Sequence, residues 1–380
     1  MNDDLTIMIG GDLIPTELNE KYFLKDDFLN YLDNNFVQEW LKSDFRIFNF
    51  EGVLCEKSYN KLLKNGPNLR ANPKCIKGLQ QLSPDLVLLA NNHSLDYGID
   101  GLKSMLNLFK KYNIKYTGLI DNSSLDFQSA ILEKRGIKIG IYNVCENEFS
   151  VATENSFGTN GLNIIKNCKE IEKLKKEVNY VIVFFHGGKE YYNYVSPECQ
   201  KICRTFIDNG ADIVITQHSH CIGCKETYNN KEIIYGQGDF IFNRKNFNGI
   251  RNNSLLINVS FSSNSFNINY IPIQKNNIFF DISKDDTIIN GFNQRSENIK
   301  NKDFVTENYN RFTKNLIFQY LCIINPPNII RKIYNKIFKK SSNFKIEDYL
   351  KIKNIIECEA HREAFINGLN GLIEGKKNEK

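Results

Sequence analysis

Four of the five histidines in this chain stand directly after short apolar segments that we predict to be buried strands. Strand ends in an α/β protein meet along the edge of a sheet, so the side chains that follow several such strands are brought close together. The segments and their histidines are Asp85–Ala90 with His93, Tyr180–Phe185 with His186, and Asp212–Thr216 with His218 and His220.

Two further apolar segments end on acidic residues. Leu5–Ile9 precedes Asp12, and Arg46–Phe50 precedes Glu51. Imidazole and carboxylate groups are common protein ligands of divalent metal ions. We therefore expect these strands to deliver a metal site to one edge of a sheet.

Strands and helices alternate over the first 240 residues, which is typical of an α/β fold. Further strands are predicted at Ile137–Val144 and Glu232–Tyr235, and a hairpin at Ser254–Phe261 and Phe266–Ile273. Short βα units followed by a hairpin predict two packed sheets flanked by helices. The predicted helices are Asp27–Lys42, Pro73–Leu82, Gly98–Tyr112, Asn163–Val178 and Pro197–Asn209, with Asn72 and Ser196 as caps before the two prolines.

The excess positive charge of the chain belongs to its C-terminal part. Residues 300–380 hold 16 Lys and Arg against 9 Asp and Glu, whereas the rest of the chain holds 33 against 35. We predict a domain over residues 1–280 and a basic, mainly helical extension over 281–380. Because the basic residues form no tight cluster with interleaved aromatic side chains, we expect a solvated helical surface and no nucleic-acid partner.

The chain begins without the basic start and apolar core of a secretory leader, and no apolar run reaches the ~20 residues of a membrane-spanning helix. We expect a cytoplasmic protein without a transmembrane segment. The basic segment Ile329–Phe338 would form an amphipathic helix that rests on the inner face of a membrane or packs on the main domain. His361 lies in a helical stretch and is expected to be a surface or packing residue.

The ten cysteines show no regular spacing, which favours reduced and mostly buried thiols. Cys221 and Cys224 follow the His218 and His220 pair at a spacing that zinc sites use. A second zinc-type site would need another pair of ligands nearby, and none stands at a useful spacing. A metal or redox role for the two cysteines is therefore the less favoured interpretation.

Spacing also indicates how the candidate ligands would act. In an extended segment, residues two apart point to the same face, so His218 and His220 would bind two metal ions ~3.5–4 Å apart. Asn92 offers a neutral carbonyl oxygen, and the adjacent His93 would be free to act as a general acid. Glu51 would bridge two ions. For an isolated histidine pair, two hydrogen-bonded imidazoles in a loop are an equal alternative.

In this order the residues resemble the CapA family, which is named for poly-γ-glutamate capsule synthesis and belongs to the calcineurin-like metallophosphoesterase superfamily. The resemblance covers roughly residues 5–275. Six blocks carry it, and they occur in the order of the family. They are Gly11-Asp12, Asn49-Phe50-Glu51, Ala90–His93 with Asp96–Gly98, His186–Tyr191, Gly210–His220 and Tyr235–Phe242.

The resemblance implies a four-layer α/β/β/α sandwich of the metallophosphoesterase type. It also implies two divalent metal ions (zinc, manganese or iron) above the strand ends. The implied residues are Asp12 and His220 for one metal, Asn92, His186 and His218 for the other, Glu51 as the bridge, His93 as the acid, and Glu190, Asn49 and Asp239 as groups that orient ligands or bind substrate.

The sequence departs from the family pattern at three points. Ile14 stands where the superfamily has a histidine, so the metal at Asp12 has one fewer protein ligand. Gly238-Asp239 replaces the usual Gly-Asn and adds an acid. Several capsule-linked members are anchored in a membrane, whereas this chain shows no anchor, so its cellular task could differ from theirs.

These features predict a metal-dependent hydrolase in which a metal-activated hydroxide attacks a phosphoester or an amide, and His93 protonates the leaving group. The resemblance implies a task in the synthesis of a capsule or another surface polymer. The substrate would be a poly-γ-glutamate-like polymer or a small phosphoester or amide, with capsule-synthesis enzymes as partners. The alternative is a non-catalytic accessory protein whose metal cleft binds polymer or partner enzymes, and Ile14 is the feature that most favours it.

Overall fold

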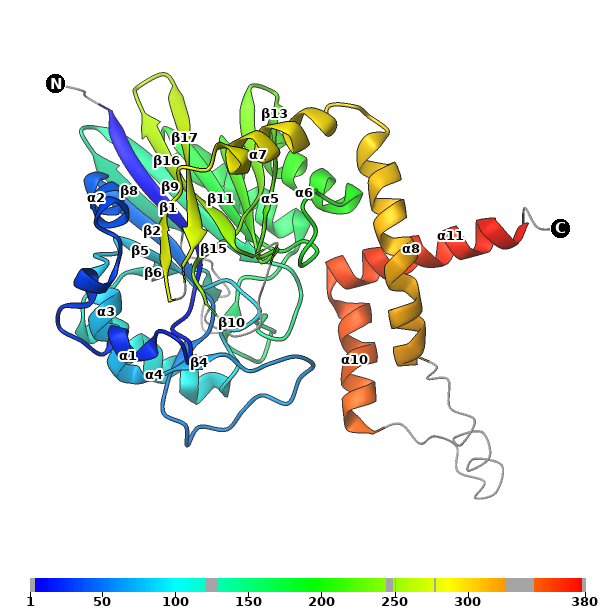
Figure 1. The fold of residues 1–380 in the computed structure, drawn as a ribbon, viewed down its shortest axis with the longest axis horizontal. Coiled ribbons are helices and arrows are strands. Elements are labelled where there is room, and N and C mark those ends of the chain that lie inside the picture. Colours follow the sequence, from blue (N-terminus) through cyan, green and yellow to red (C-terminus); the bar gives the residue numbers. More distant parts are fainter. Residues whose placement is uncertain are drawn as a thin grey trace.

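The computed structural model describes residues 4–120, 129–243, 249, 251–276, 278–324 and 345–377. Two β-sheets lie face to face, and helices cover the outer face of each sheet (Figure 1). Further helices follow at the C-terminal end of the chain. The four-layer α/β/β/α sandwich and the C-terminal helices that we predicted are therefore confirmed.

The larger sheet contains eight strands among the described residues, in the order β18-β17-β16-β1-β2-β5-β6, with β15 also paired to β1. Its central strands are parallel, whereas β16, β17 and β18 form an antiparallel series that includes the predicted hairpin. The strands are β1 (Leu5–Leu13), β2 (Phe45–Phe50), β5 (Leu86–Leu88), β6 (Tyr116–Thr117), β15 (Asp239–Ile241), β16 (Asn253–Phe261), β17 (Phe266–Lys275) and β18 (Phe280–Ile282).

The smaller sheet has the order β13-β14-β12-β11-β9-β8, with six strands in the described part of the chain. Its four inner strands are parallel, and β8 and β13 are antiparallel edges. The strands are β8 (Ala130–Lys134), β9 (Ile137–Cys145), β11 (Tyr180–His186), β12 (Ile213–Gln217), β13 (Ile222–Tyr228) and β14 (Lys231–Gln237). Two short pairs complete the set, β3 (Val53–Leu54) with β4 (Arg70–Ala71), and β7 (Leu119–Ile120) with β10 (Gly158–Thr159).

The expectation that one sheet edge carries all the candidate ligands is wrong. The strands β1, β2 and β5 belong to the larger sheet, whereas β11 and β12 belong to the smaller one. Alternation of strands and helices predicts parallel strands, but it does not tell which sheet each strand joins. The ligands therefore come from two sheets whose strand ends meet at one rim of the sandwich.

Burial alternates along the strands because each sheet is covered on both faces. In β11, Ile182 and Phe184 point between the sheets, whereas Val183 and Phe185 pack against the helices on the outer face. The space between the sheets is filled mostly by aliphatic side chains from both of them, with a few aromatic rings such as Phe184 and Phe261. This covering on two faces explains the unbroken apolar runs in the sequence.

Helices on the larger sheet pack around Trp40, which stacks near Phe240 and donates a hydrogen bond from Nε1 to the carbonyl of Leu82 (2.8 Å). The predicted helix at 27–42 is two elements, because Asp33 caps a new helix by accepting from the backbone N–H of Phe36 (2.9 Å). The helices are α1 (Glu20–Phe23), η1 (Phe28–Tyr31), α2 (Asn34–Lys42), η2 (Pro73–Cys75), α3 (Ile76–Gln81) and α4 (Gly98–Lys111) on this side, and α5 (Ile164–Lys175) and α6 (Pro197–Asp208) on the smaller sheet.

The sequence also predicted two helix caps. The side chain of Asn72 accepts from the backbone N–H of Lys74 (3.0 Å), and the hydroxyl of Ser196 accepts from that of Cys199 (3.3 Å). Each cap stands directly before a proline in the first turn of the helix. Proline lacks a backbone N–H, and at this position an N–H would have no partner within the helix. Both predictions are confirmed.

The helices in the described C-terminal part are α7 (Asp286–Asn298), α8 (Phe304–Ile324), α10 (Ile346–Glu357) and α11 (Glu359–Lys377). Helix α7 packs on β13 and β17 of the sandwich, whereas α8, α10 and α11 lie to one side of it (Figure 1). A cluster around Tyr192 and Tyr309 joins α8, α10 and α11 to the segment after β11. The predicted boundary at residue 280 stays a prediction, and the basic segment Ile329–Phe338 falls outside the described residues. No helix in the described ranges combines the length and the apolar character needed to cross a bilayer.

We expect Asp44 to stabilise the sandwich by joining the two sheets. It accepts hydrogen bonds from the backbone N–H of Thr6 (2.9 Å), from Lys134 (2.7 Å) and from Arg135 (2.6 Å). Burial opposes its ionisation, but these bonds hold the pKa of Asp44 below its usual value. Asp44→Asn should lower the free energy of unfolding by about 1 kcal/mol at pH 7.

The sign of the Asp44 effect sets its pH dependence. A carboxyl whose folded pKa is lowered contributes stability above its unfolded pKa of about 4, and that contribution is lost as the pH falls further. The difference between the Asp44→Asn variant and the unmodified protein should therefore shrink below about pH 4 in urea titrations. Asp26→Asn, at an exposed pair with Lys77, is the matched control and should change little. An equal loss in both variants would contradict the proposal.

The close approach of β15 to β1 predicts a second stability effect. A Cβ atom on Gly11 would overlap the carbonyl oxygen of Gly238, so Gly11→Ala should force the two strands apart. We expect a loss of about 1–3 kcal/mol in thermal or urea unfolding. Gly371→Ala is the control, because nothing lies within 4 Å of a Cβ at this helical position. That control should gain about 0.5–1 kcal/mol.

Candidate metal centre

The predicted ligands gather where the strand ends of the two sheets meet, and all of them are buried. Each is positioned by a strand or by the turn that follows it. Asp12 lies in β1, Glu51 follows β2, Asn92 and His93 follow β5, His186 ends β11, and His218 and His220 lie between β12 and β13.

Glu51 is at the middle of this group. Neither of its carboxylate oxygens has a hydrogen-bond partner among the described residues, although the side chain is fully buried. Its Oε1 lies 3.7 Å from Nε2 of His93 and of His186, and 3.8 Å from Nε2 of His220. Buried carboxylates are normally paired, and these distances are too long for hydrogen bonds but fit ligands that surround a cation.

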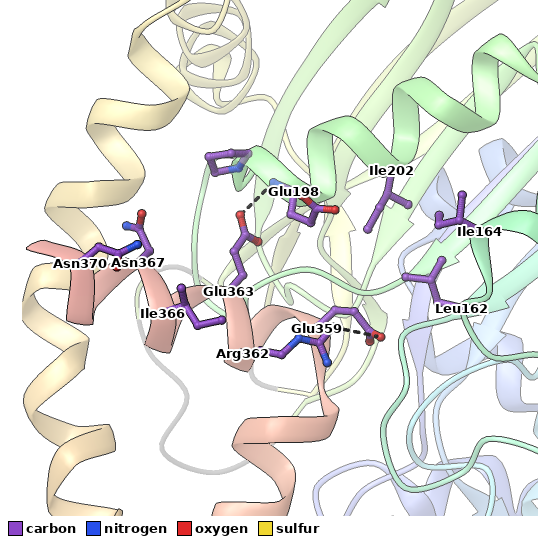
Figure 2. A pocket seen from close by; sticks show the side chains of 11 residues that line it. Leu162, Ile164, Glu198, Ile202, Glu359, Arg362, Glu363, Ile366, Asn367 and Asn370 are labelled. Atoms are coloured by element: carbon purple, nitrogen blue, oxygen red, sulfur yellow. Dashed lines mark hydrogen bonds and ion pairs between the residues drawn. The ribbon is translucent and has the colours of Figure 1, made fainter.

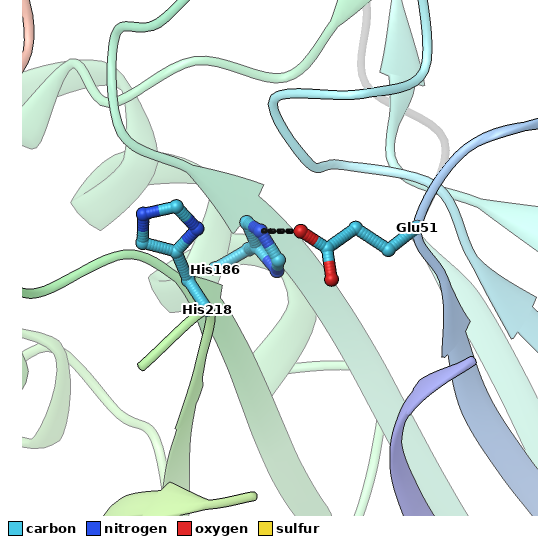
Figure 3. A group of neighbouring side chains, drawn as sticks. All are labelled: Glu51, His186 and His218. Carbon is cyan, nitrogen blue, oxygen red and sulfur yellow. Dashed lines mark ion pairs between the residues drawn. The ribbon is translucent and has the colours of Figure 1, made fainter. Parts of the chain in front are cut away.

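Two groups of potential ligands share Glu51. One comprises Asp12, Glu51 and His220, and the other comprises Glu51, His186 and His218 (Figure 3). Within each group, one ligand atom from every residue lies within 4.8 Å of the others. The structure thus brings together two adjacent sets of oxygen and nitrogen donors, as a pair of divalent ions requires.

Asp12 is held in place by two donors. Asn49 donates from Nδ2 to Oδ1 (2.8 Å), and the backbone N–H of His218 donates to Oδ2 (3.2 Å). Burial and the nearby Asp239 raise the pKa of Asp12 to about 7. Ile14 packs in the apolar core of the larger sheet and offers no ligand atom. Any further ligands of a metal ion at Asp12 therefore come from other parts of the fold.

Asn92 is oriented toward the second group. Its Nδ2 donates to Oε2 of Glu148 (2.6 Å), and this bond points its Oδ1 toward Nε2 of His186, 3.2 Å away. Burial, with His218 and His220 nearby, holds the pKa of His186 well below its usual value. The imidazole is therefore neutral, which is the form that binds a metal ion.

The backbone conformation at His218 and His220 differs from the one that we predicted. Both have positive φ angles, +85° and +54°, in place of the extended conformation that the His-x-His spacing indicated. Their ring centroids are nonetheless 6.0 Å apart. Left-handed backbone is strained for non-glycine residues and is tolerated where the surrounding structure holds it. Here the bond from the His218 N–H to Asp12 is one such restraint.

The Nε2 atom of His93 faces Glu51, and its Nδ1 atom faces Asp96. Its Nδ1 lies 2.6 Å from Oδ2 of Asp96, and Lys64 forms a buried ion pair with the same carboxylate. Burial lowers the pKa of His93, against the opposing effect of Asp96. Sequence reasoning quoted Asp96 without a role and missed Lys64, which lies in a loop without any motif.

Two further acids were missed. Glu146 and Glu148 follow β9, and Oε1 of Glu146 lies 3.3 Å from Nε2 of His218. The two glutamates and His218 form a third group of potential ligands. The signal was present, because the predicted strand Ile137–Val144 leads directly into these acids.

Asp239, the extra acid of the last motif, is compensated. Its Oδ1 lies 2.8 Å from Nδ1 of His220, and its Oδ2 accepts from Nε (3.0 Å) and Nη2 (2.8 Å) of Arg251. Asp239 thus holds the His220 ring in place. Glu190 lies farther out, with Oε1 3.9 Å from Nε2 of His220. Burial opposes ionisation of Glu190, but His218 and His220 lower its pKa.

Cys221 and Cys224 are buried thiols, and burial raises the pKa of each to about 12. Neither joins a group of potential metal ligands in the described part of the chain. A cavity of about 550 Å³ lies between α6 and α11, and Ile202 and Ile366 are among the residues that line it (Figure 2). None of the predicted site residues lines it.

Comparison with known proteins places this geometry in context. A family model described as "Bacterial capsule synthesis protein PGA_cap" matches residues 6–244. The capsule biosynthesis protein CapA of Bacillus anthracis is 29% identical over 254 residues, which cover 64% of this chain and 61% of that protein. The PGA biosynthesis protein CapA of Bacillus subtilis (strain 168) is 29% identical over 252 residues, or 64% of each chain. The chain therefore spans less than two thirds of the length of these relatives.

Among solved structures, a 5'-nucleotidase precursor from Thermus thermophilus matches with a TM-score of 0.43 and 15% identity. The match covers 70% of this chain and 54% of that one.

Because the carboxylate of Glu51 has no partner, we expect its replacement to have opposite effects on stability with and without a metal ion. In the presence of a chelator, Glu51→Gln should be more stable than the unmodified protein by about 1–2 kcal/mol, because burial and the nearby Asp12 raise the pKa of Glu51 well above its usual value, and this shift opposes folding at neutral pH. With Mn²⁺ or Zn²⁺ at about 100 times Kd, the unmodified protein should gain about 2.7 kcal/mol, and the variant should gain less. Thermal unfolding with metal analysis measures both. A variant that binds and responds to metal as the unmodified protein does would contradict the assignment.

Proposed function

The chain belongs to the bacterial capsule synthesis protein PGA_cap family, and we propose that it is a metal-dependent hydrolase that acts in the synthesis of a capsule polymer. The observation that carries the proposal is Glu51, a fully buried carboxylate without a hydrogen-bond partner among the described residues and surrounded by imidazoles. Carboxylate, imidazole and amide donors at this spacing fit a pair of divalent ions such as zinc, manganese or iron.

When bound, the ions would lower the pKa of a water to about 7 and neutralise charge on the substrate. Asp12 and His220 would hold one ion, and Asn92, His186 and His218 the other, with Glu51 between them. Asn49 and Asp239 orient two of these ligands by hydrogen bonds to Asp12 and His220. Glu190 would contact a ligand or the substrate at the outer side.

His93 is suited to protonate the leaving group. Asp96 accepts a hydrogen bond from Nδ1 when that nitrogen carries the proton, and Lys64 forms an ion pair with the same carboxylate. The ring is thereby fixed with Nε2 facing the cluster of ligands, 3.7 Å from Glu51. A proton delivered from Nε2 would reach a leaving oxygen or nitrogen directly above the centre.

The substrate class follows from the family together with the site. The two Bacillus relatives are described as proteins of capsule and PGA biosynthesis. We propose a poly-γ-glutamate-like polymer, or a phosphoester or amide formed during its synthesis, as the substrate. Enzymes of polymer synthesis would be the partners.

A non-catalytic accessory role is the second candidate, and Ile14 favours it. This side chain is buried in the apolar core, so the Asp12 position lacks the ligand that a histidine would supply there. In that case the same site would bind the polymer or a partner enzyme without cleaving a bond.

A His93→Ala variant tests the proposal. We expect kcat to fall by about 10²–10⁴-fold with unchanged metal content, because an acid is removed and no proposed ligand is lost. Asp96→Asn should reduce kcat less, since it disturbs only the orientation of the ring. Hydrolysis of p-nitrophenyl phosphate and of a γ-glutamyl amide, in the presence of Mn²⁺ or Zn²⁺, provides the measurement.

The Glu51→Gln variant is the reference for activity lost through metal loss. Full activity in His93→Ala would remove this residue from the reaction. A protein that binds both ions but cleaves neither class of substrate would favour the accessory role.

A further inference from the structure

A separate group of ligand types lies where the C-terminal helices meet the sandwich. One ligand atom each of Glu148, Cys358 and His361 lies within 4.8 Å of the others. Glu148 comes from the segment after β9, whereas Cys358 separates α10 from α11 and His361 lies in the first turn of α11. Segments more than 200 residues apart therefore converge at this point.

Cys358 is placed as a metal-binding thiol would be. It is 1% exposed and stands directly before α11, where the backbone N–H of His361 points to it and favours the thiolate. Burial and the nearby Glu146 and Glu148 act in the other direction and raise the pKa of the thiol well above its usual value. A bound divalent ion would reverse this balance, with the thiol proton released to solvent.

His361 is held as a neutral ring. Its Nδ1 lies 2.9 Å from the hydroxyl of Tyr320, which comes from α8. Burial and the nearby Lys189 lower the pKa of His361 to about 2, so the imidazole is uncharged at neutral pH. Metal-binding histidines commonly have one ring nitrogen fixed by such a partner. The His361 ring also packs edge-on against Tyr320, which agrees with the prediction of a surface or packing residue.

Glu146 contacts both this group and the first centre. It is 2% exposed, its Oε1 lies 3.3 Å from Nε2 of His218, and its carboxylate accepts a hydrogen bond from the thiol of Cys358. Together with Glu148 and Cys358 it forms a buried cluster of groups that a positive ion would stabilise.

We propose that Glu148, Cys358 and His361 hold a further divalent ion of the zinc type, separate from the centre at Glu51. Thiolate, imidazole and carboxylate together are ligands that suit zinc. The fourth position would be taken by water or by Glu146. This site goes beyond the proposed hydrolase, because it requires neither His93 nor Glu51.

The ion would fasten the C-terminal helices to the rim of the active centre. Other contacts already join α11 to the sandwich. Glu359 accepts from the backbone and the side-chain amide of Asn147 (both 2.7 Å), and Glu363 accepts from the backbone N–H of Glu198 (2.8 Å; Figure 2). Through Glu148 and Asn92, the proposed ion would also influence the orientation of His186.

Cobalt and zinc binding to the full chain test the inference. A Co²⁺ ion bound to a thiolate gives a near-ultraviolet charge-transfer band, which carboxylate and imidazole ligands do not give. We expect this band in the unmodified protein and in Glu51→Gln, and its loss in Cys358→Ser. Zinc analysis after dialysis should show one ion fewer per chain in Cys358→Ser and in His361→Ala.

Cys168→Ser, at another buried thiol, is the matched control and should keep the band. Tyr320→Phe should weaken the Cys358-dependent ion by roughly 10–100-fold, because it frees the His361 ring. Retained binding at the Glu51 centre, together with unchanged circular dichroism, would show that Cys358→Ser is folded. Equal zinc content in all variants, or no thiolate band in the unmodified protein, would overturn the inference without affecting the proposed hydrolase.

Discussion

At the rim of the sandwich where the candidate ligands meet, the protein buries more carboxylates than its hydrogen bonds can satisfy. Glu51 has no partner among the described residues, and Glu146 has an unpartnered oxygen nearby. Buried, unpaired carboxylates oppose folding unless they are protonated or held by cations. Apolar packing between the two sheets keeps this arrangement folded, so the stability of the sandwich compensates for the unfavourable charges at its edge. Binding of a metal ion would neutralise these carboxylates and so increase the free energy of unfolding.

The backbone around the rim is shaped to bring the acids together. Because β15 pairs with β1, Asp239 stands directly beside Asp12, and the absence of a side chain at Gly11 permits the close approach of the Gly238 carbonyl. Two adjacent acids would repel each other, and Arg251 offsets part of the charge by binding Asp239. The substitution of acid for amide in the last motif is therefore matched by a buried arginine, which accounts for how the chain tolerates it.

In the sequence, the residues that follow the predicted strands carried most of the information about the candidate site. The rule that polar residues after apolar runs meet at a rim brought out Asp12, Glu51 and the four histidines, and the structure gathers them there. The same rule applied to β9 would have found Glu146 and Glu148. Lys64 and Arg251 had no such signal, because their positions depend on loops whose path is set by tertiary packing. The left-handed backbone at His218 and His220 was equally invisible, since only contacts with other strands impose it.

The two halves of the centre differ in ways that bear on its chemistry. The position at Asp12 lacks a ligand from Ile14, and the positive charge of Arg251 offsets part of the negative charge that Asp239 adds there. The position at His186 and His218 instead borders Glu146, which adds negative charge. With one fewer ligand at Asp12 and an additional acid beside His218, we would expect a divalent ion to bind more tightly at the second position. One ion there would be sufficient to offset the charge of Glu51, which both groups of potential ligands share.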